Sequence, residues 1–134
     1  MTSPTNTATT PDYDAIVRVV QLYIDGFQGD VGKFKEAFHE DAWIFFTDAA
    51  GVPDKHLISD WFEGWTASKQ HIVGRFISVT QAGDAANVLL GWDSPLGPSY
   101  SWVDFHCLLR VNGVWKITNK TATHRSRAGW AAEQ

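Results

Sequence analysis

Two ionisable side chains, Asp104 and His106, stand two positions apart in a segment rich in aromatic and β-branched residues. In a strand, side chains at this spacing point to the same face, so both groups can contact one ligand or one water. A carboxylate beside an imidazole suits general acid–base catalysis, because Asp104 can accept a proton or fix the imidazole tautomer while His106 exchanges a proton near neutral pH. The alternatives are a structural hydrogen-bond cluster and simple contact with a ligand.

A two-residue turn, Asn112-Gly113, determines how these side chains pair. Asn-Gly between two apolar segments is the strongest short-range hairpin signal, and it predicts strands over residues 100–111 and 114–123. Counting back from the turn places His106 opposite Asn119 and leaves Lys120 in water on the other face. The predicted inner face then holds Trp102, Asp104, His106, Leu108, Ile117, Asn119 and Thr121.

A second predicted hairpin turns at residues 83–84, and the same counting puts His71 and Arg75 on the inner face. His71 is a third candidate acid or base, although at the start of its strand it could instead point into solvent. An inward Arg75 would anchor an anionic ligand, pair with Asp93 or Asp104, or indicate a β-bulge that shifts the register.

Three helices are predicted before these hairpins. Apolar residues recur at helical spacing from Ile16 to Phe27, and the pattern stops near residues 26–29. Asp30 is a predicted N-cap for a second, short helix. The third helix is indicated by the apolar stripe Ile58, Trp61, Phe62 and Trp65. With a strand over residues 43–47, the expected fold class is α+β, with three N-terminal helices packed in a curved, mainly antiparallel sheet.

The chain carries seven Trp, eight Phe and three Tyr, which is more aromatic bulk than a small core usually needs. The rings either line a flat slot for a polycyclic ligand or pack the core. The candidate ligand-binding residues are Tyr23, Phe27, Trp61, Trp65, Trp92 and Trp102, with Asn119 as a positioning donor and Arg75 as an anchor.

Composition limits the class of protein. The 134 residues fit a single domain over residues 12–134, preceded by a loose, Thr-rich tail over residues 1–11. A net charge of -4 without basic blocks argues against nucleic acid and anionic membranes as partners. The single cysteine excludes an internal disulfide, and the His and Asp spacing matches no standard metal site.

The sequence also lacks the patterns of membrane spans, signal peptides and nucleotide-binding loops. No apolar run approaches the ~18–20 residues of a membrane span, and the first residues lack the pattern of a signal peptide, so we expect a soluble, cytoplasmic protein. No GxGxxG motif or phosphate loop is present, and no cofactor is expected. The outer face of the predicted sheet carries Val103, Phe105, Leu109 and Val111, which is too apolar for water and predicts a homodimer through this face.

Three stretches resemble a known superfamily: AFHEDA at residues 37–42, GDAANV at residues 83–88 and RVNGVWKITNK at residues 110–120. With the order of the predicted elements, residues 13–124 resemble the nuclear transport factor 2-like (NTF2-like) superfamily. Residues 23–42 and the WKITNK ending look most like its Putative lumazine-binding branch, close to the SnoaL-like polyketide cyclases. The resemblance implies a cone-shaped barrel with a sheet wrapped around the first helix, a pocket in its mouth, and often a homodimer through the outer sheet face.

The superfamily includes ketosteroid isomerases, dehydratases and cyclases as well as non-catalytic binding domains. KQHIVG at residues 69–74 is similar to the segment in which scytalone-dehydratase-like members carry an acid–base histidine, and His71 matches that position. The leading hypothesis is a cofactor-independent acid–base enzyme, an isomerase, dehydratase or cyclase acting on a hydrophobic ring-bearing molecule. Asp104, His106 and His71 would be its proton-transfer residues. The alternatives are a binding domain for a flat ligand such as a pteridine, and a structural dimer.

Overall fold

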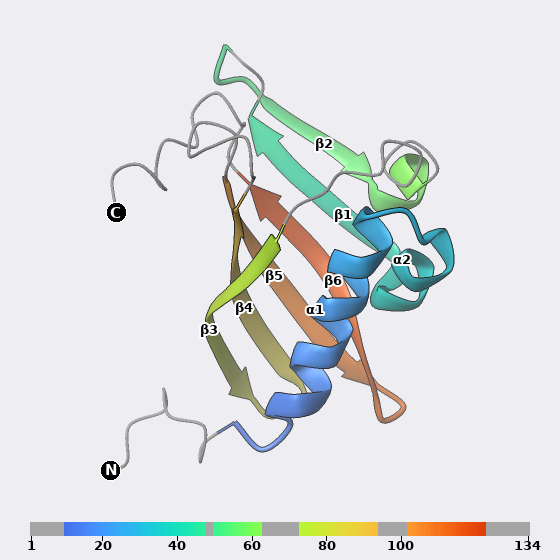
Figure 1. Ribbon diagram of the computed structural model, residues 1–134, viewed down its shortest axis with the longest axis vertical. Helices are drawn as coiled ribbons and strands as arrows, with labels where there is room; N and C mark the ends of the chain where they lie inside the picture. Colours follow the sequence, from blue (N-terminus) through green and yellow to red (C-terminus); the bar gives the residue numbers. More distant parts are fainter. Residues whose placement is uncertain (1–9, 48–49, 63–72, 94–101, 123–134) are drawn as a thin grey trace.

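The computed structural model describes residues 10–47, 50–62, 73–93 and 102–122. Within these ranges, two α-helices, α1 (Tyr13–Phe27) and α2 (Val31–Ala37), come before a six-stranded sheet (Figure 1). The strands are β1 (Phe38–Thr47), β2 (Pro53–Leu57), β3 (Val73–Ala82), β4 (Ala85–Asp93), β5 (Trp102–Val111) and β6 (Val114–Ala122). A short 3-10 helix, η2 (Ile58–Trp61), follows β2.

The strands are ordered β2-β1-β6-β5-β4-β3, with α1 lying against one face of the sheet (Figure 1). Only β1 and β6 run parallel among the described pairs, and the other pairs are antiparallel. The expected α+β class with a mainly antiparallel sheet is therefore confirmed. Both predicted long hairpins form, and residues 53–57 add a further hairpin strand beside β1.

The prediction of three helices is wrong for the described residues, which contain two α-helices. The described part of the predicted third helix is the four-residue 3-10 turn η2, followed by Phe62 in a helical conformation. Ile58 and Phe62 are buried in the core, as the apolar stripe predicted. A stripe of so few residues cannot distinguish a 3-10 turn from the start of an α-helix, because both place residues three positions apart on neighbouring faces. Trp65 and the rest of that predicted helix lie outside the described residues.

The first two helices form as predicted and meet at a tight corner. Helix α1 buries a stripe that includes Ile16, Val20 and Tyr23 against the sheet. The Asp30 side chain caps α2 by accepting a hydrogen bond from the Lys33 backbone N–H at 3.2 Å. Gly26 permits the close approach, since a Cβ there would lie 2.7 Å from the backbone nitrogen of Phe34.

The predicted register of the β5–β6 hairpin holds from the turn to the pair Leu108–Ile117 and is wrong beyond it. Thr118 is an extra residue in β6, so Cys107 pairs with Asn119 and His106 pairs with Lys120. Because the side chains of a strand alternate, this one-residue bulge exchanges the two faces of the strand end. It turns Lys120 into the core and Asn119 away from it.

A second bulge lies in the β3–β4 hairpin, where Phe76 pairs with Leu90 and Ser78 with Leu89. Ile77 is the extra residue and is exposed. The bulge turns Arg75 outward and brings Gly74 against α1, where a Cβ would lie 2.5 Å from Ile24 Cδ1. The predicted inward position of Arg75 is therefore wrong, and the bulge considered as one of its explanations is present.

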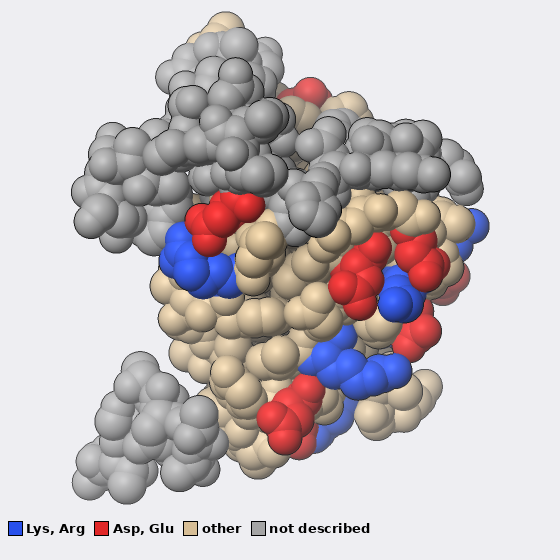
Figure 2. All heavy atoms as spheres, viewed as in Figure 1, with Lys and Arg blue, Asp and Glu red and all other residues tan. Residues whose placement is uncertain are grey.

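Charges of both signs alternate on the face of the molecule that carries α1 (Figure 2). Arg18 pairs with Glu36 at 3.5 Å and Lys33 with Asp25 at 3.6 Å, and all four side chains are exposed. Exposed pairs of this kind contribute little to stability. No helix within the described ranges is long and apolar enough to cross a membrane.

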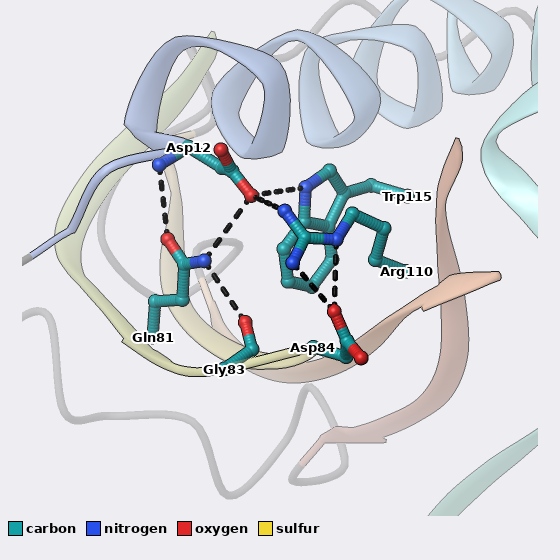
Figure 3. A network of polar contacts seen from close by, with 6 residues as sticks. All are labelled: Asp12, Gln81, Gly83, Asp84, Arg110 and Trp115. Carbon is teal, nitrogen blue, oxygen red and sulfur yellow. Dashed lines mark hydrogen bonds and ion pairs between the residues drawn. The ribbon is translucent and has the colours of Figure 1, made fainter. Parts of the chain in front are cut away.

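A polar network fastens the start of α1 to the turns of both long hairpins (Figure 3). The Asp12 carboxylate accepts hydrogen bonds from Gln81 Nε2 at 3.2 Å, from Trp115 Nε1 at 3.2 Å and from the Arg110 guanidinium. Arg110 also donates to the Asp84 carboxylate at 2.9 Å and 2.5 Å. One side chain of the helix start thus joins β3, β5 and β6.

Replacement of Asp12 by alanine should lower the free energy of unfolding by about 1–3 kcal/mol, because the buried Trp115 indole N–H loses its acceptor. Chemical denaturation followed by far-UV circular dichroism measures the change. Asp14→Ala, two residues further along the same helix start and exposed, is the matched control and should change the stability by less than about 0.5 kcal/mol. Equal losses in the two variants would contradict the role of the network.

Candidate functional site

Asp104 lies near the start of β5, and its side chain is fully buried. Its Oδ2 atom accepts two hydrogen bonds from neutral donors, one from Trp92 Nε1 at 2.6 Å and one from the Tyr23 hydroxyl at 3.2 Å. Trp92 comes from β4 and Tyr23 from α1. The carboxylate is therefore the point at which one helix and two strands meet.

His106 follows on the same face of β5 and is also fully buried. Its Nε2 atom lies 3.6 Å from Asp104 Oδ2, and its ring centroid lies 5.0 Å from that of Tyr23. Neither ring nitrogen of His106 has a hydrogen-bond partner, and the same holds for Asp104 Oδ1. Buried polar atoms are almost always paired in folded proteins, so three unpaired atoms in one cluster are unusual.

Lys120 completes the cluster from β6, although the hairpin register predicted from the sequence places it in water on the other face. Its Nζ atom lies 3.7 Å from Asp104 Oδ2 and 5.4 Å from the centroid of the Tyr23 ring. Its side chain is only 5% exposed. We refer to Tyr23, Trp92, Asp104, His106 and Lys120 as the Asp104 cluster.

The Asp104 carboxyl is a carboxylate at neutral pH. Burial alone would raise its pKa, because a charge is less stable away from water. The positive charge of Lys120 and the contacts with His106 and Trp92 outweigh burial and lower the pKa below its usual range. For Lys120, burial lowers the pKa of the amine, and the neighbouring Asp104 charge opposes that effect.

The other two titratable members of the cluster are neutral at neutral pH. Burial lowers the pKa of His106, and the Lys120 charge lowers it further, while Asp104 acts in the opposite direction. Burial and the Asp104 charge raise the pKa of Tyr23 well above its usual range, so its hydroxyl keeps its proton and donates it to Asp104. A neutral imidazole has one donor and one acceptor nitrogen, which allows it either to give or to take a proton.

Three aromatic residues proposed as ligand contacts pack against one another. The Tyr23 and Trp92 rings meet edge to face at 5.3 Å, and Phe27 lies 5.2 Å from Trp92 and 6.1 Å from Tyr23. All three are buried. These rings form part of the core beside the Asp104 cluster, as the simpler of the two interpretations expected.

Two polar residues proposed for the site lie elsewhere. Asn119 is turned away from His106 by the β6 bulge, donates to the Trp43 carbonyl at 3.3 Å and accepts from the Thr121 hydroxyl at 3.0 Å. Arg75 forms a two-pronged ion pair with Asp93, at 3.0 Å and 3.3 Å, on the surface. Neither side chain contacts the Asp104 cluster.

Four other residues predicted for the site lie wholly or partly outside the described part of the structure. His71 and Trp65 lie outside the described residues. For Trp61 and Trp102 only the backbone is described: Trp61 ends η2, and Trp102 pairs with Trp92 at the start of β5. In the part of the chain that the structure covers, no three His, Cys, Asp or Glu side chains gather closely enough to hold a metal ion.

Solved structures with the same fold are numerous. An NTF2-like protein of unknown function from Shewanella baltica is 26% identical over 87% of this chain and 96% of that chain, with a TM-score of 0.76. A second, from Methylobacillus flagellatus, is 22% identical over 84% of this chain and 91% of that chain, with a TM-score of 0.69. A protein from Shewanella frigidimarina described as a "putative ketosteroid isomerase" is 14% identical over 81% of this chain and 94% of that chain, with a TM-score of 0.59.

The last two similarities establish the fold alone. Comparison with curated protein sequences gives no match. The pattern of one sequence family, described as Putative lumazine-binding, matches residues 11–122, which include both helices and all six strands. The chain therefore belongs to the Putative lumazine-binding family of the NTF2-like superfamily.

Proposed function

We propose that this protein is a cofactor-independent acid–base enzyme that isomerises, dehydrates or cyclises a hydrophobic, ring-bearing small molecule at the Asp104 cluster. The observation that carries the proposal is the set of three buried, unpaired atoms: Asp104 Oδ1 and the two ring nitrogens of His106. Each unpaired buried group costs about 1–3 kcal/mol of stability. Such a cost is understandable where the groups serve to receive a ligand.

The charge states of the cluster fit this chemistry. Asp104 is a carboxylate whose Oδ2 is held by Trp92 and Tyr23, which leaves Oδ1 to take a proton from a substrate. His106 is a neutral imidazole next to it, which can give its ring proton to another atom of the substrate and take over the proton held by Asp104, so that both groups return to their starting charge. A positioned acid or base contributes typically about 10²–10⁴ in rate. The likeness in fold to a structure described as a "putative ketosteroid isomerase" is consistent with this reaction class.

Asp104→Asn should abolish most of the activity, because an amide keeps the shape and accepts the same hydrogen bonds but cannot take up a proton. We expect a fall in kcat/KM of about 10²–10⁴ with little change in ligand affinity. The assay is a panel of ring ketones and hydroxyketones in heavy water, in which mass spectrometry detects both deuterium uptake and loss of water.

The matched control for this assay is Asp14→Asn, which changes the same residue type at an exposed position of α1. Its turnover should equal that of the unmodified protein. Full turnover by Asp104→Asn on any substrate that the unmodified protein converts would rule out Asp104 as the base.

A second candidate function is non-catalytic binding of a flat heterocycle, and the description of the family favours it. In this case lumazine should quench the tryptophan fluorescence and emerge chemically unchanged. Trp92→Phe should reduce the quenching, since Trp92 belongs to the Asp104 cluster, whereas Trp115→Phe at the other end of α1 should not. Quenching by lumazine together with no conversion across the ketone panel would favour binding over catalysis.

We also propose that the protein acts as a homodimer through the face of the sheet that α1 does not cover. Large apolar side chains exposed on the strands there include Phe45, Phe105 and Leu109. Exposed apolar patches of this kind mark interfaces in soluble proteins. A second copy of the same face would supply an apolar surface of the same composition.

Phe105→Glu should convert the dimer to a monomer, because the dimer would bury a charge in an apolar interface. Size-exclusion chromatography with light scattering measures the mass. Val52→Glu is the matched control at an exposed apolar residue outside the strands, and it should remain dimeric. A monomeric unmodified protein, or a dimeric Phe105→Glu variant, would exclude this interface.

A further inference from the structure

We propose that Lys120 is a positioning residue of the Asp104 cluster, whose ammonium group keeps the Asp104 carboxylate charged and in place and keeps His106 neutral beside it. The inference rests on the function proposed above, because it gives Lys120 a part in the same proton transfer. It concerns a residue that the sequence places on the solvent side of its strand and that the structure buries.

The geometry brings two nitrogen groups to one side of Asp104. Lys120 Nζ lies 3.7 Å and His106 Nε2 3.6 Å from the same atom, Asp104 Oδ2. His106 and Lys120 are also register partners across β5 and β6, so both side chains point to the same face. Lys120 is therefore close enough to act on both of the proposed proton-transfer groups, while Asp104 Oδ1 stays available to a substrate.

Among the described residues, few other buried polar groups lie near the Asp104 cluster. The elements around the cluster contribute the Tyr23 hydroxyl from α1 and the Trp92 indole from β4, and neither is charged at neutral pH. Within the described ranges, the buried polar and charged side chains besides these are Asp104, His106, Lys120 and Thr10. Lys120 is thus the one buried cation in that part of the chain.

Folding alone does not account for a lysine at this position. Replacing a buried ion pair by apolar side chains of similar volume is often neutral or stabilising. The charged oxygen of Asp104 already accepts hydrogen bonds from Trp92 and Tyr23. Burying the charge of Lys120 is costly, and the effect of that charge on Asp104 and His106 explains why a lysine stands here.

The direction of that effect is the same for both neighbours. The Lys120 charge lowers the pKa of Asp104, against the effect of burial, and lowers the pKa of His106, in addition to burial. Removal of the charge should therefore raise both values. The Asp104 carboxylate would then be protonated at a higher pH than in the unmodified protein, and so would the His106 imidazole.

The test is a nuclear magnetic resonance titration of the full chain without substrate, following the Asp carboxyl carbons and the His ring nitrogens from about pH 3 to about pH 9. In Lys120→Met, which keeps the length of the side chain, the midpoint of Asp104 should rise by about 1–3 pH units and that of His106 should also rise. Lys120→Arg keeps the positive charge, so the midpoints of Asp104 and His106 in this variant should lie close to those of the unmodified protein. Lys116→Met, on the same strand but less buried, should change neither.

Unchanged midpoints in Lys120→Met would overturn the proposal, since a purely structural lysine would not move them. If Lys120→Met does not fold, the unmodified protein still gives a decisive measurement. The Lys120 Cε signal should then shift with the same midpoint as the Asp104 carboxyl, and the absence of such a step would overturn the proposal.

The outcomes separate this inference from the proposed function, because the titrations need no substrate. Full turnover by Asp104→Asn would reject the reaction and leave the electrostatic effect of Lys120 measurable. An inactive Asp104→Asn together with unmoved midpoints in Lys120→Met would reject only the role of Lys120. Where turnover is measurable, the acid limb of kcat/KM should move upward in Lys120→Met by the same amount as the Asp104 midpoint.

Discussion

The charge on Asp104 is the constraint on which the rest of the structure depends. A carboxylate without any exposed surface is stable only when hydrogen-bond donors or a cation replace the water it has lost. Those groups come from α1, β4 and β6, so pairing the charge constrains how the helix docks against the centre of the sheet. The surrounding apolar side chains supply most of the stabilisation by burial, and the carboxylate determines which arrangement of them is allowed.

Helix α1 is anchored at both ends by an aspartate that accepts an indole N–H. At its start, Asp12 accepts from the buried Trp115 indole and pairs with Arg110, and the Asp12 and Arg110 side chains are partly exposed. Near its end, Tyr23 reaches Asp104, which accepts from Trp92 and faces Lys120 in the interior. The two anchors use similar chemistry in different surroundings. The carboxylate of the partly exposed anchor has partners from three strands, whereas the buried anchor leaves three atoms unpaired, which is where reactive groups are expected.

Much of this architecture could be predicted from the sequence. Helical spacing located α1 and α2, and the Asn-Gly and Gly-Asp turns located the two long hairpins within a few residues. The inward, buried positions of Asp104 and His106 also followed from counting back from the turn. What could not be predicted were the two bulges, at Ile77 and Thr118, because a bulge depends on how well a whole strand packs against the helix and not on a local signal. Arg75, Asn119 and Lys120 were misplaced for that single reason.

The bulge at Thr118 also changes how the chemistry of this site can vary. In β6, residues 114–117 point to the same faces with or without the extra residue, because they lie between the turn and the bulge. Residues 119–122 lie beyond the bulge, and the extra residue exchanges their two faces. The extra residue therefore replaces the amide of Asn119 and the hydroxyl of Thr121 on the inner face by the ammonium group of Lys120, and its loss would do the reverse. In such a hairpin, a change of one residue in the length of a strand changes which side chains reach the inner face as effectively as a substitution does.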